Sequence, residues 1–236
     1  MLFAAGLGTR LQPLTNDRPK ALVEINGKTL LQHAIEHLKK HGIRDIIVNI
    51  HHFGDKVLQI LKAHQNFGCN ITISDERATI LETGGGLLKV APLLKNQKEI
   101  VLYNVDVLSN IDLKKMLSTH KAKGNHATLA VRNRSSSRYL QFDSNGYLCG
   151  WINTQTGKER TVRNSLKKEA LAFSGIHIIS TELINAIEER GKFSITQSYL
   201  NLADRFDIAA YPHDEDYWFD VGKPEKLQIA KEFLSK

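Results

Sequence analysis

Short apolar runs alternate with amphipathic segments in the first half of the chain, and this alternation constrains the fold more than any other feature. Four runs of four or five mostly apolar residues are typical of strands buried on both faces; they cover residues 2–5, 46–50, 71–74 and 100–103. Helical periodicity lies between them. Strands that alternate with helices favour a mostly parallel sheet with right-handed crossovers, so we expect an α/β fold.

The clearest predicted helix follows Thr29. Apolar residues recur there on one helical face, at Leu30, Leu31, Ala34, Ile35 and Leu38. Thr29 and Gln32 form a T-x-x-Q capping box, and Gly42 is placed to end the helix. Further helices are expected over residues 55–64, after Gly86 and from Asp112.

The second half predicts a mixed extension of the sheet. Strands are expected at residues 127–132 and 173–179, with a hairpin formed by 139–142 and 147–152. The polar, basic stretch 153–169 is interpreted as a loop. A short helix over 181–189 and a last helix from Pro224 complete the chain; the inward residues of the last helix are predicted to be Leu227, Ala230, Phe233 and Leu234. Without a repeat or a linker, residues 1–236 are interpreted as one domain with a small β extension.

Composition excludes several classes of protein. The 236 residues are 42% hydrophobic and 24% charged, unlike disordered, collagen-like or coiled-coil chains. No apolar run approaches eighteen residues, the apolar start is too short for a signal peptide, and the two cysteines form no disulfide framework, so we expect a cytoplasmic protein. The net charge of +7 suggests a polyanionic partner, either nucleic acid, a membrane or a phosphorylated small molecule, without choosing among them.

A glycine-containing loop follows the first predicted strand. Gly6 and Gly8 allow backbone N–H groups to approach a polyphosphate, and Arg10 and Lys20 then supply positive charge. Leu11 stands where a dinucleotide-binding fingerprint would have its third glycine, and no Gly-Lys-Ser or Gly-Lys-Thr of a Walker loop follows. Taken alone, the Gly-x-Gly also fits an ordinary tight turn.

Two further segments suggest ligand contacts. Residues 81–86 read Leu-Glu-Thr-Gly-Gly-Gly before a predicted helix, which favours close approach of a base or an anion, or simply a tightly packed helix entry. Asp106 follows the strand at 100–103, at the edge where α/β sheets bind ligands. Next to phosphates, this carboxylate is suited to hold Mg²⁺; otherwise it caps a turn.

Residues 6–20, read as G-x-G-T-R-x-x-P-L-T-x-x-x-P-K, resemble the signature loop of the nucleotidyltransferases that join a nucleoside triphosphate to a sugar 1-phosphate. The resemblance continues through residues 81–86, 102–106, 172–176 and 218–225 and so covers nearly the whole chain. Two positions depart from the family pattern: Val105 stands where glycine is usual, and Lys223 stands where threonine is usual.

This resemblance implies the nucleotide-diphospho-sugar transferase fold, with residues 1–125 mainly binding nucleotide and 126–236 mainly binding sugar. It implies Mg²⁺ on Asp106 and Asp220, with Arg10 and Lys20 as catalytic residues. The implied nucleotide contacts are Ala5, Gly6, Leu7, Gly8, Thr9, Arg10, Thr83, Gly84 and Asn104, and the implied sugar-phosphate contacts are Lys20, Asn104, Ser174 and Gly175.

The expected reaction yields an NDP-sugar, for use in the cell envelope, and pyrophosphate. UTP is favoured because the sequence of residues 81–86 is most similar to the corresponding segment of uridylyltransferases in the family. The alternatives are a GTP-dependent mannose- or heptose-1-phosphate guanylyltransferase and a cytidylyltransferase for phosphocholine. A nucleic-acid-binding module and an inactive ligand sensor are further alternatives. We expect no nucleic-acid or membrane partner, and the oligomeric state stays open.

Overall fold

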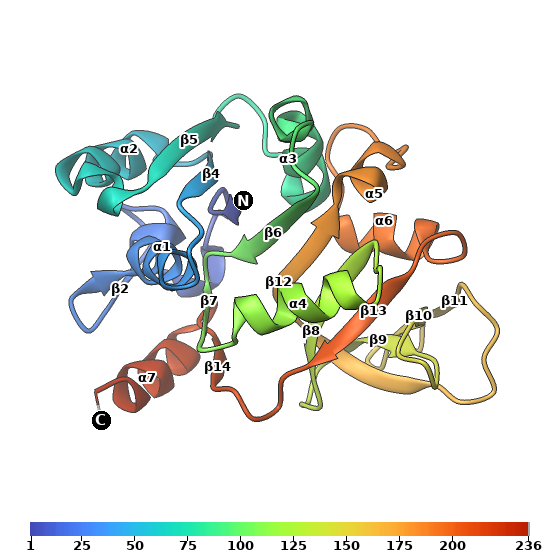
Figure 1. Cartoon of the computed structure of the whole chain (residues 1–236). Coiled ribbons are helices and arrows are strands. Elements are labelled where there is room, and N and C mark those ends of the chain that lie inside the picture. Colours follow the sequence, from blue (N-terminus) through green and yellow to red (C-terminus); the bar gives the residue numbers. More distant parts are fainter. Residues whose placement is uncertain (236) are drawn as a thin grey trace. The chain divides into compact units, whose positions relative to one another are not determined.

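The computed structural model describes residues 1–235 and divides into two compact units (Figure 1). The first unit contains Met1–Glu82, Tyr103–Leu113 and the chain from Tyr217 onward. The second contains Thr83–Leu102 and Lys114–Asp216. Each unit therefore combines segments that are distant in the sequence.

The sheet of the first unit is entirely parallel. Its strand order places the end of β6 beside β1, then β4 and β5, and the bounds are β1 (Leu2–Phe3), β4 (Asp45–Ile50), β5 (Asn70–Asp75) and β6 (Glu99–Asn104). Helix α1 (Leu30–Lys40) lies in the connection from β1 to β4, and α2 (Gly54–Ala63) lies in the connection from β4 to β5. All four predicted strands of the first half are present, each within one or two residues of its expected bounds. The predicted α/β fold class is confirmed.

Helix α1 begins as expected but with half of the capping box. The Thr29 side chain accepts a hydrogen bond from the Gln32 N–H at 3.1 Å. The Gln32 side chain turns instead to Glu36, donating from Nε2 to Oε1 at 2.9 Å. Gly42 adopts a left-handed conformation (φ 85°) just after the helix, which explains why the helix ends there.

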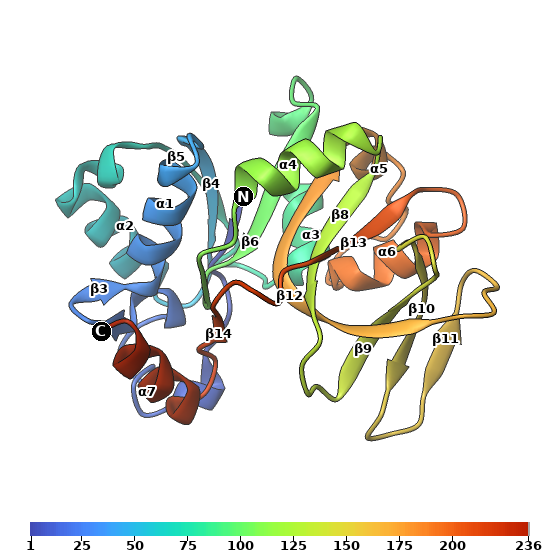
Figure 2. The same ribbon diagram turned by 60° about the horizontal axis from the view of Figure 1, so that its bottom comes forward.

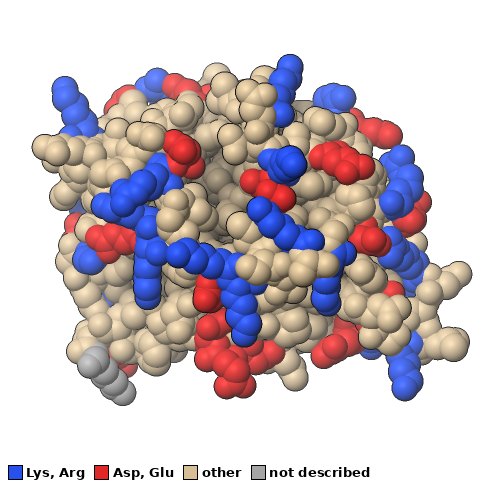
Figure 3. Space-filling view, in the orientation of Figure 1, with Lys and Arg blue, Asp and Glu red and all other residues tan. Residues whose placement is uncertain are grey.

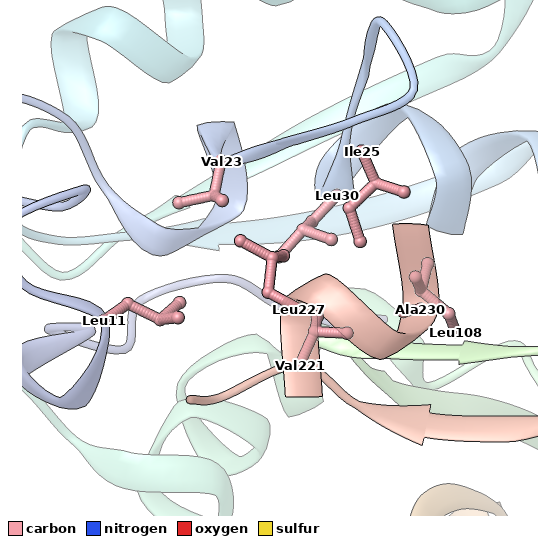
Figure 4. Close-up of a cluster of buried hydrophobic side chains, with 8 residues drawn as sticks. All are labelled: Leu11, Val23, Ile25, Leu30, Leu108, Val221, Leu227 and Ala230. Carbon is pink, nitrogen blue, oxygen red and sulfur yellow. The ribbon is translucent and has the colours of Figure 1, made fainter. Parts of the chain in front are cut away.

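An antiparallel ribbon in the first unit joins β7 (Val107–Ser109) to β14 (Trp218–Asp220), and α7 (Pro224–Phe233) follows it. A hairpin of β2 (Glu24–Ile25) and β3 (Lys28–Thr29) lies in the same unit. Buried side chains from these elements form one cluster (Figure 4), made of Leu11, Val23, Ile25, Leu30, Leu108, Val221, Leu227 and Ala230. Leu227 and Ala230 point inward as predicted, whereas Phe233 is 46% exposed, so its predicted burial was wrong.

The second unit is mainly antiparallel (Figure 2). Strand β12 pairs with β8 and β9, β9 with β10, and β10 with β11, while β13 lies parallel to β8. The bounds are β8 (Ala127–Arg132), β9 (Arg138–Phe142), β10 (Leu148–Asn153), β11 (Glu159–Thr161), β12 (Glu169–Ser180) and β13 (Ile208–Pro212), with helices α4 (Leu113–Ala122), α5 (Thr181–Asn185) and α6 (Ile195–Leu202). The loop predicted at 153–169 contains β11, whose side chains are all exposed and therefore carry no apolar pattern.

The three glycines of residues 81–86 lie inside α3 (Glu82–Val90) rather than before it, so the expected helix start was wrong. A Cβ at Gly84 would lie 2.2 Å from Cε2 of the Phe193 ring. The Gly84 N–H donates to the Phe193 carbonyl at 2.9 Å, and the Thr83 hydroxyl accepts from the Ile195 N–H at 3.0 Å. Close packing against a distant segment therefore accounts for glycine at position 84.

Substitution of Gly84 by Ala should destabilise the second unit by about 1–3 kcal/mol, because the new methyl group overpacks against the buried Phe193 ring. Urea denaturation measures the change. The double variant Gly84→Ala/Phe193→Leu should recover at least half of the loss, since the smaller side chain frees the space. Equal stability of Gly84→Ala and the unaltered protein would contradict this packing.

The predictions about nucleic-acid and membrane partners concern the surface charge and the helices of the protein. Figure 3 shows Lys and Arg side chains interspersed with Asp and Glu across one face. Among residues 1–235, no helix combines the length and the apolar character that crossing a membrane requires.

Candidate active site

The loop after β1 folds around Gly8. This residue has a left-handed φ of 68°, and a Cβ there would lie 3.0 Å from both Lys20 Cβ and Thr15 Cγ2. The Thr15 hydroxyl donates to the Gly8 carbonyl at 2.9 Å. Glycine at position 8 thus permits a compact loop that leads into the short helix Thr9–Leu11, and the loop sets Arg10 and Lys20 on neighbouring backbone.

A buried polar pair supports this loop from below. Asn49 Oδ1 accepts the N–H groups of Ala4 and Ala5 at 2.6 and 3.2 Å, and Asn49 Nδ2 donates to Glu76 at 2.8 Å. The second oxygen of Glu76 accepts the Leu81 N–H at 3.2 Å. Asn49 and Glu76 are 2% and 1% exposed, so they brace the loop rather than contact a ligand.

Sequence reasoning missed these two residues. Each is a polar residue at or beside the end of an apolar strand. That position could have indicated a buried polar group near the loop. The predicted nucleotide contact Ala5 already donates its N–H to Asn49, whereas Gly6, Leu7 and Thr9 are exposed in the loop.

Two carboxylates from distant parts of the chain meet in the first unit. Asp106 follows β6, and Asp220 ends β14, where it pairs in register with Val107. The Val221 N–H donates to the Asp106 carbonyl at 3.0 Å, and the Gly222 N–H donates to Asp220 Oδ1 at 3.0 Å. The β7–β14 ribbon therefore brings together the two residues predicted to bind metal.

Three charged side chains of the predicted site converge at Gly222, and the fourth, Asp106, is joined to them by Lys20. A Cβ on this glycine would lie 2.9 Å from Arg10 Nη2, 2.9 Å from Asp220 Oδ1 and 3.2 Å from Lys20 Nζ. The Lys20 ammonium forms an ion pair with Asp106 Oδ2. The side chains of Lys20 and Asp106 are 11% and 20% exposed, so the pair is partly shielded from water. Two cations and two anions thus share one small volume.

The carboxylate pair fits a magnesium ion. Mg²⁺ in proteins is usually held by one or two carboxylates, with substrate phosphates and water completing its shell. Within residues 1–235, no group of three or more His, Cys, Asp or Glu side chains could hold a metal alone. Asp106 and Asp220 therefore suit a metal that a phosphate ligand helps to bind.

Gly222→Ala should impair activity more than stability. Its methyl group would displace Arg10, Lys20 and Asp220, which are side-chain ends able to move without unfolding the core. A displacement of about 1 Å can cost about 100-fold in rate, so we expect kcat/KM to fall 10- to 100-fold with the melting temperature changed by less than about 2 °C. Lys223→Ala, at the exposed neighbouring position, should stay within about twofold. Full activity in Gly222→Ala would contradict the convergence.

The remaining predicted residues have different surroundings. Asn104 ends β6 and is half-buried. Thr83 and Gly84 belong to the second unit, where both contact the 193–195 segment. Their assignment to the nucleobase stays a prediction.

Ser174 and Gly175 lie within β12 of the second unit. Ser174 is 1% exposed, and its hydroxyl forms a 2.8 Å hydrogen bond with His213 Nε2. Burial, reinforced by Arg132, lowers the pKa of His213 to about 4, so this imidazole is neutral at pH 7. Gly175 has a φ of 77° where the register between β12 and β8 shifts. Contact of Ser174 and Gly175 with the sugar stays a prediction.

Comparisons with a family model and with curated proteins indicate the same family. The family model described as "Nucleotidyl transferase" matches residues 1–236. An N-acetylmuramate alpha-1-phosphate uridylyltransferase of Caulobacter vibrioides is 32% identical, with 100% of this chain and 96% of that protein covered. A mannose-1-phosphate guanyltransferase of Kluyveromyces lactis is 27% identical, and the chain spans 62% of its length.

Solved structures agree in fold. A putative glucose-1-phosphate thymidylyltransferase of Bacillus anthracis, in complex with a sucrose, superposes with a TM-score of 0.82 at 19% identity, over 98% of this chain and 93% of that one. HddC of Yersinia pseudotuberculosis, complexed with GMP-PN, gives a TM-score of 0.79 at 22% identity, over 99% and 97% of the two chains.

Proposed function

Because the chain belongs to the nucleotidyl transferase family and is therefore a nucleotidyltransferase, we propose that it joins a nucleoside triphosphate to a sugar 1-phosphate. The products are an NDP-sugar and pyrophosphate. The observation that carries the proposal is the proximity of Arg10, Lys20 and Asp220 at Gly222, together with the ion pair between Lys20 and Asp106. Such a site offers both cations for phosphate oxygens and carboxylates for a metal.

The reaction needs no nucleophile from the protein. The second pKa of a phosphate monoester is about 6, so the sugar phosphate is largely dianionic at pH 7 and attacks the α-phosphorus directly. The protein must position two anions and neutralise their charge. Arg10 binds the departing β- and γ-phosphates, Lys20 binds the α-phosphate or the acceptor phosphate, and the N–H groups of Leu7 and Gly8 face the polyphosphate. Mg²⁺ on Asp106 and Asp220 would supply further charge neutralisation.

UTP and an N-acetylated sugar 1-phosphate are the proposed substrates. Support comes from the Caulobacter relative, which is a uridylyltransferase matched over almost its full length. A site whose donors and acceptors match the N3–H and carbonyl edge of uracil rejects bases without that pattern. In this proposal, residues 81–86 recognise the base, and the β12 strand at Ser174 and Gly175 lies beside the sugar.

A pyrophosphate-release screen tests the proposal. Four nucleoside triphosphates are each combined with N-acetylmuramate, N-acetylglucosamine, mannose and heptose 1-phosphates, and CTP also with phosphocholine. We expect the highest kcat/KM for UTP with an N-acetylated sugar. A higher value for GTP with mannose or heptose 1-phosphate would overturn the substrate assignment, and no turnover with any pair would overturn the reaction.

Arg10→Ala should lower kcat about 100-fold and change KM for the sugar phosphate less than about threefold, because the guanidinium acts mostly as negative charge develops on pyrophosphate. Steady-state kinetics at saturating nucleotide separate the two constants. Arg18→Ala removes an exposed arginine paired with Asp17 and serves as the matched control. Unchanged turnover in Arg10→Ala would remove this residue from the catalytic set.

A further inference from the structure

The ammonium of Lys20 occupies a specific place in the site. It contacts one oxygen of Asp106 directly and lies 3.2 Å from the Gly222 Cβ position, which is itself 2.9 Å from Asp220 Oδ1. The lysine cation therefore lies against one of the two carboxylates that fit a metal and close to the other. An ammonium and a divalent cation cannot both use this oxygen of Asp106.

The site is electrically balanced without a metal. Arg10 and Lys20 carry two positive charges, and Asp106 and Asp220 carry two negative ones. A divalent cation entering alone would leave an excess of two positive charges in a partly buried volume. A nucleoside triphosphate, with about four negative charges, removes that excess and offers its own oxygens to the ammonium.

The backbone keeps Lys20 in this place. Its Cβ is close to Gly8, whose left-handed turn is fixed by Thr15, and the ammonium ends in a shielded ion pair rather than in water. Lys28, in contrast, is 45% exposed and pairs with Glu36 at the surface. The charge of Lys20 therefore acts on a carboxylate of the site, whereas the charge of Lys28 acts at the protein surface.

We propose that Lys20 is a built-in counter-ion for Asp106 and Asp220, which keeps the affinity for divalent cations low until a nucleotide draws the ammonium onto its phosphates. The inference rests on the proposed function and adds an order to it: the metal binds with or after the nucleotide. By linkage, the nucleotide raises metal affinity and the metal raises nucleotide affinity by the same factor.

The test measures binding of Mn²⁺ alone, with no nucleotide present, by the loss of the free-ion signal in electron paramagnetic resonance. Lys20→Gln and Lys20→Met remove the charge, and Lys20→Arg keeps it. Lys28→Gln is the matched control, because it loses the same charge in the same unit away from the carboxylates. Circular dichroism and melting curves select the variants that fold.

We expect Lys20→Gln or Lys20→Met to bind Mn²⁺ at least about tenfold more tightly than the unaltered protein, since one repelling charge leaves and one ligand oxygen is released. Lys20→Arg and Lys28→Gln should stay within about twofold. Adding Asp106→Asn to the Lys20→Gln variant should abolish the gain. Equal Mn²⁺ affinity in the folded neutral variants and the unaltered protein would overturn the proposal, as would an equal gain in Lys28→Gln.

These outcomes are separate from those of the substrate screen. Tighter Mn²⁺ binding in Lys20→Gln with no turnover on any substrate pair supports the counter-ion role and overturns the proposed reaction. Turnover in the unaltered protein without tighter Mn²⁺ binding in the variants overturns the counter-ion role and leaves the reaction standing.

Discussion

Replacing Asp106 by Asn is expected to lower kcat/KM by about 10³-fold with little change in stability. The amide keeps the shape of the carboxylate and can still accept a hydrogen bond from Lys20, so the fold is preserved. It lacks the negative charge that a metal ligand in the proposed site needs, and removal of one electrostatic group of this kind costs about 10²- to 10³-fold. Pyrophosphate release under saturating metal measures the loss.

Asp45→Asn is the matched control for this change. Asp45 begins β4, at the opposite end of the parallel strands from Asp106, and accepts a hydrogen bond from Asn70 at 2.9 Å. Its substitution removes the same charge from the same unit and should leave kcat/KM within about twofold. If Asp106→Asn keeps more than a tenth of the activity, the carboxylate is not part of the reacting site.

Acid is expected to destabilise the second unit strongly. Burial lowers the pKa of His177 to about 3 and that of His213 to about 4, from the usual 6.5. Below pH 6.5 the unfolded chain takes up a proton at each site while the folded chain does not, so stability falls as the pH falls toward the folded pKa values. At pH 5 each histidine costs about 2 kcal/mol, and the two together cost about 4 kcal/mol.

Urea denaturation at pH 7 and pH 5 measures this loss, and His177→Gln isolates one part of it. The glutamine amide can replace the imidazole in the 2.5 Å hydrogen bond between His177 Nδ1 and the Tyr199 hydroxyl, but it does not titrate. The variant should lose about 2 kcal/mol less between the two pH values than the unaltered protein. Identical pH dependence in both proteins would show that His177 is not the buried neutral group described here.

Much of the first unit follows from local sequence. The strands of the parallel sheet have continuous apolar runs. The cap at Thr29 was predicted from the four-residue pattern T-x-x-Q. The loop at residues 6–20 was identified by its resemblance to a family signature loop, because Gly6 and Gly8 alone also fit an ordinary tight turn. The roles of Arg10 and Lys20 in the reaction stay predictions. These features depend on neighbours in the chain, which is why the sequence pattern contains them.

Other features depend on distant pairings that no local pattern records. The approach of Asp220 to Asp106 depends on the register between β14 and β7. The helical position of Gly84 depends on Phe193, which fills the space that a side chain would need. Strand β11 has only exposed side chains, so its pairing with β10 left no alternation to detect.

The division of the first unit into separated segments has a consequence for how the protein is made. Leu11 of the loop at residues 6–20 packs in the same cluster as Val221, Leu227 and Ala230 (Figure 4), and Asp220 directly precedes Val221. A ribosome producing this chain releases the glycine loop, Lys20 and Asp106 long before residue 220. The second unit, by contrast, is complete by Asp216. In the nascent chain, Asp220 can therefore join Asp106, Lys20 and Arg10 only after the segments of the second unit have been synthesised.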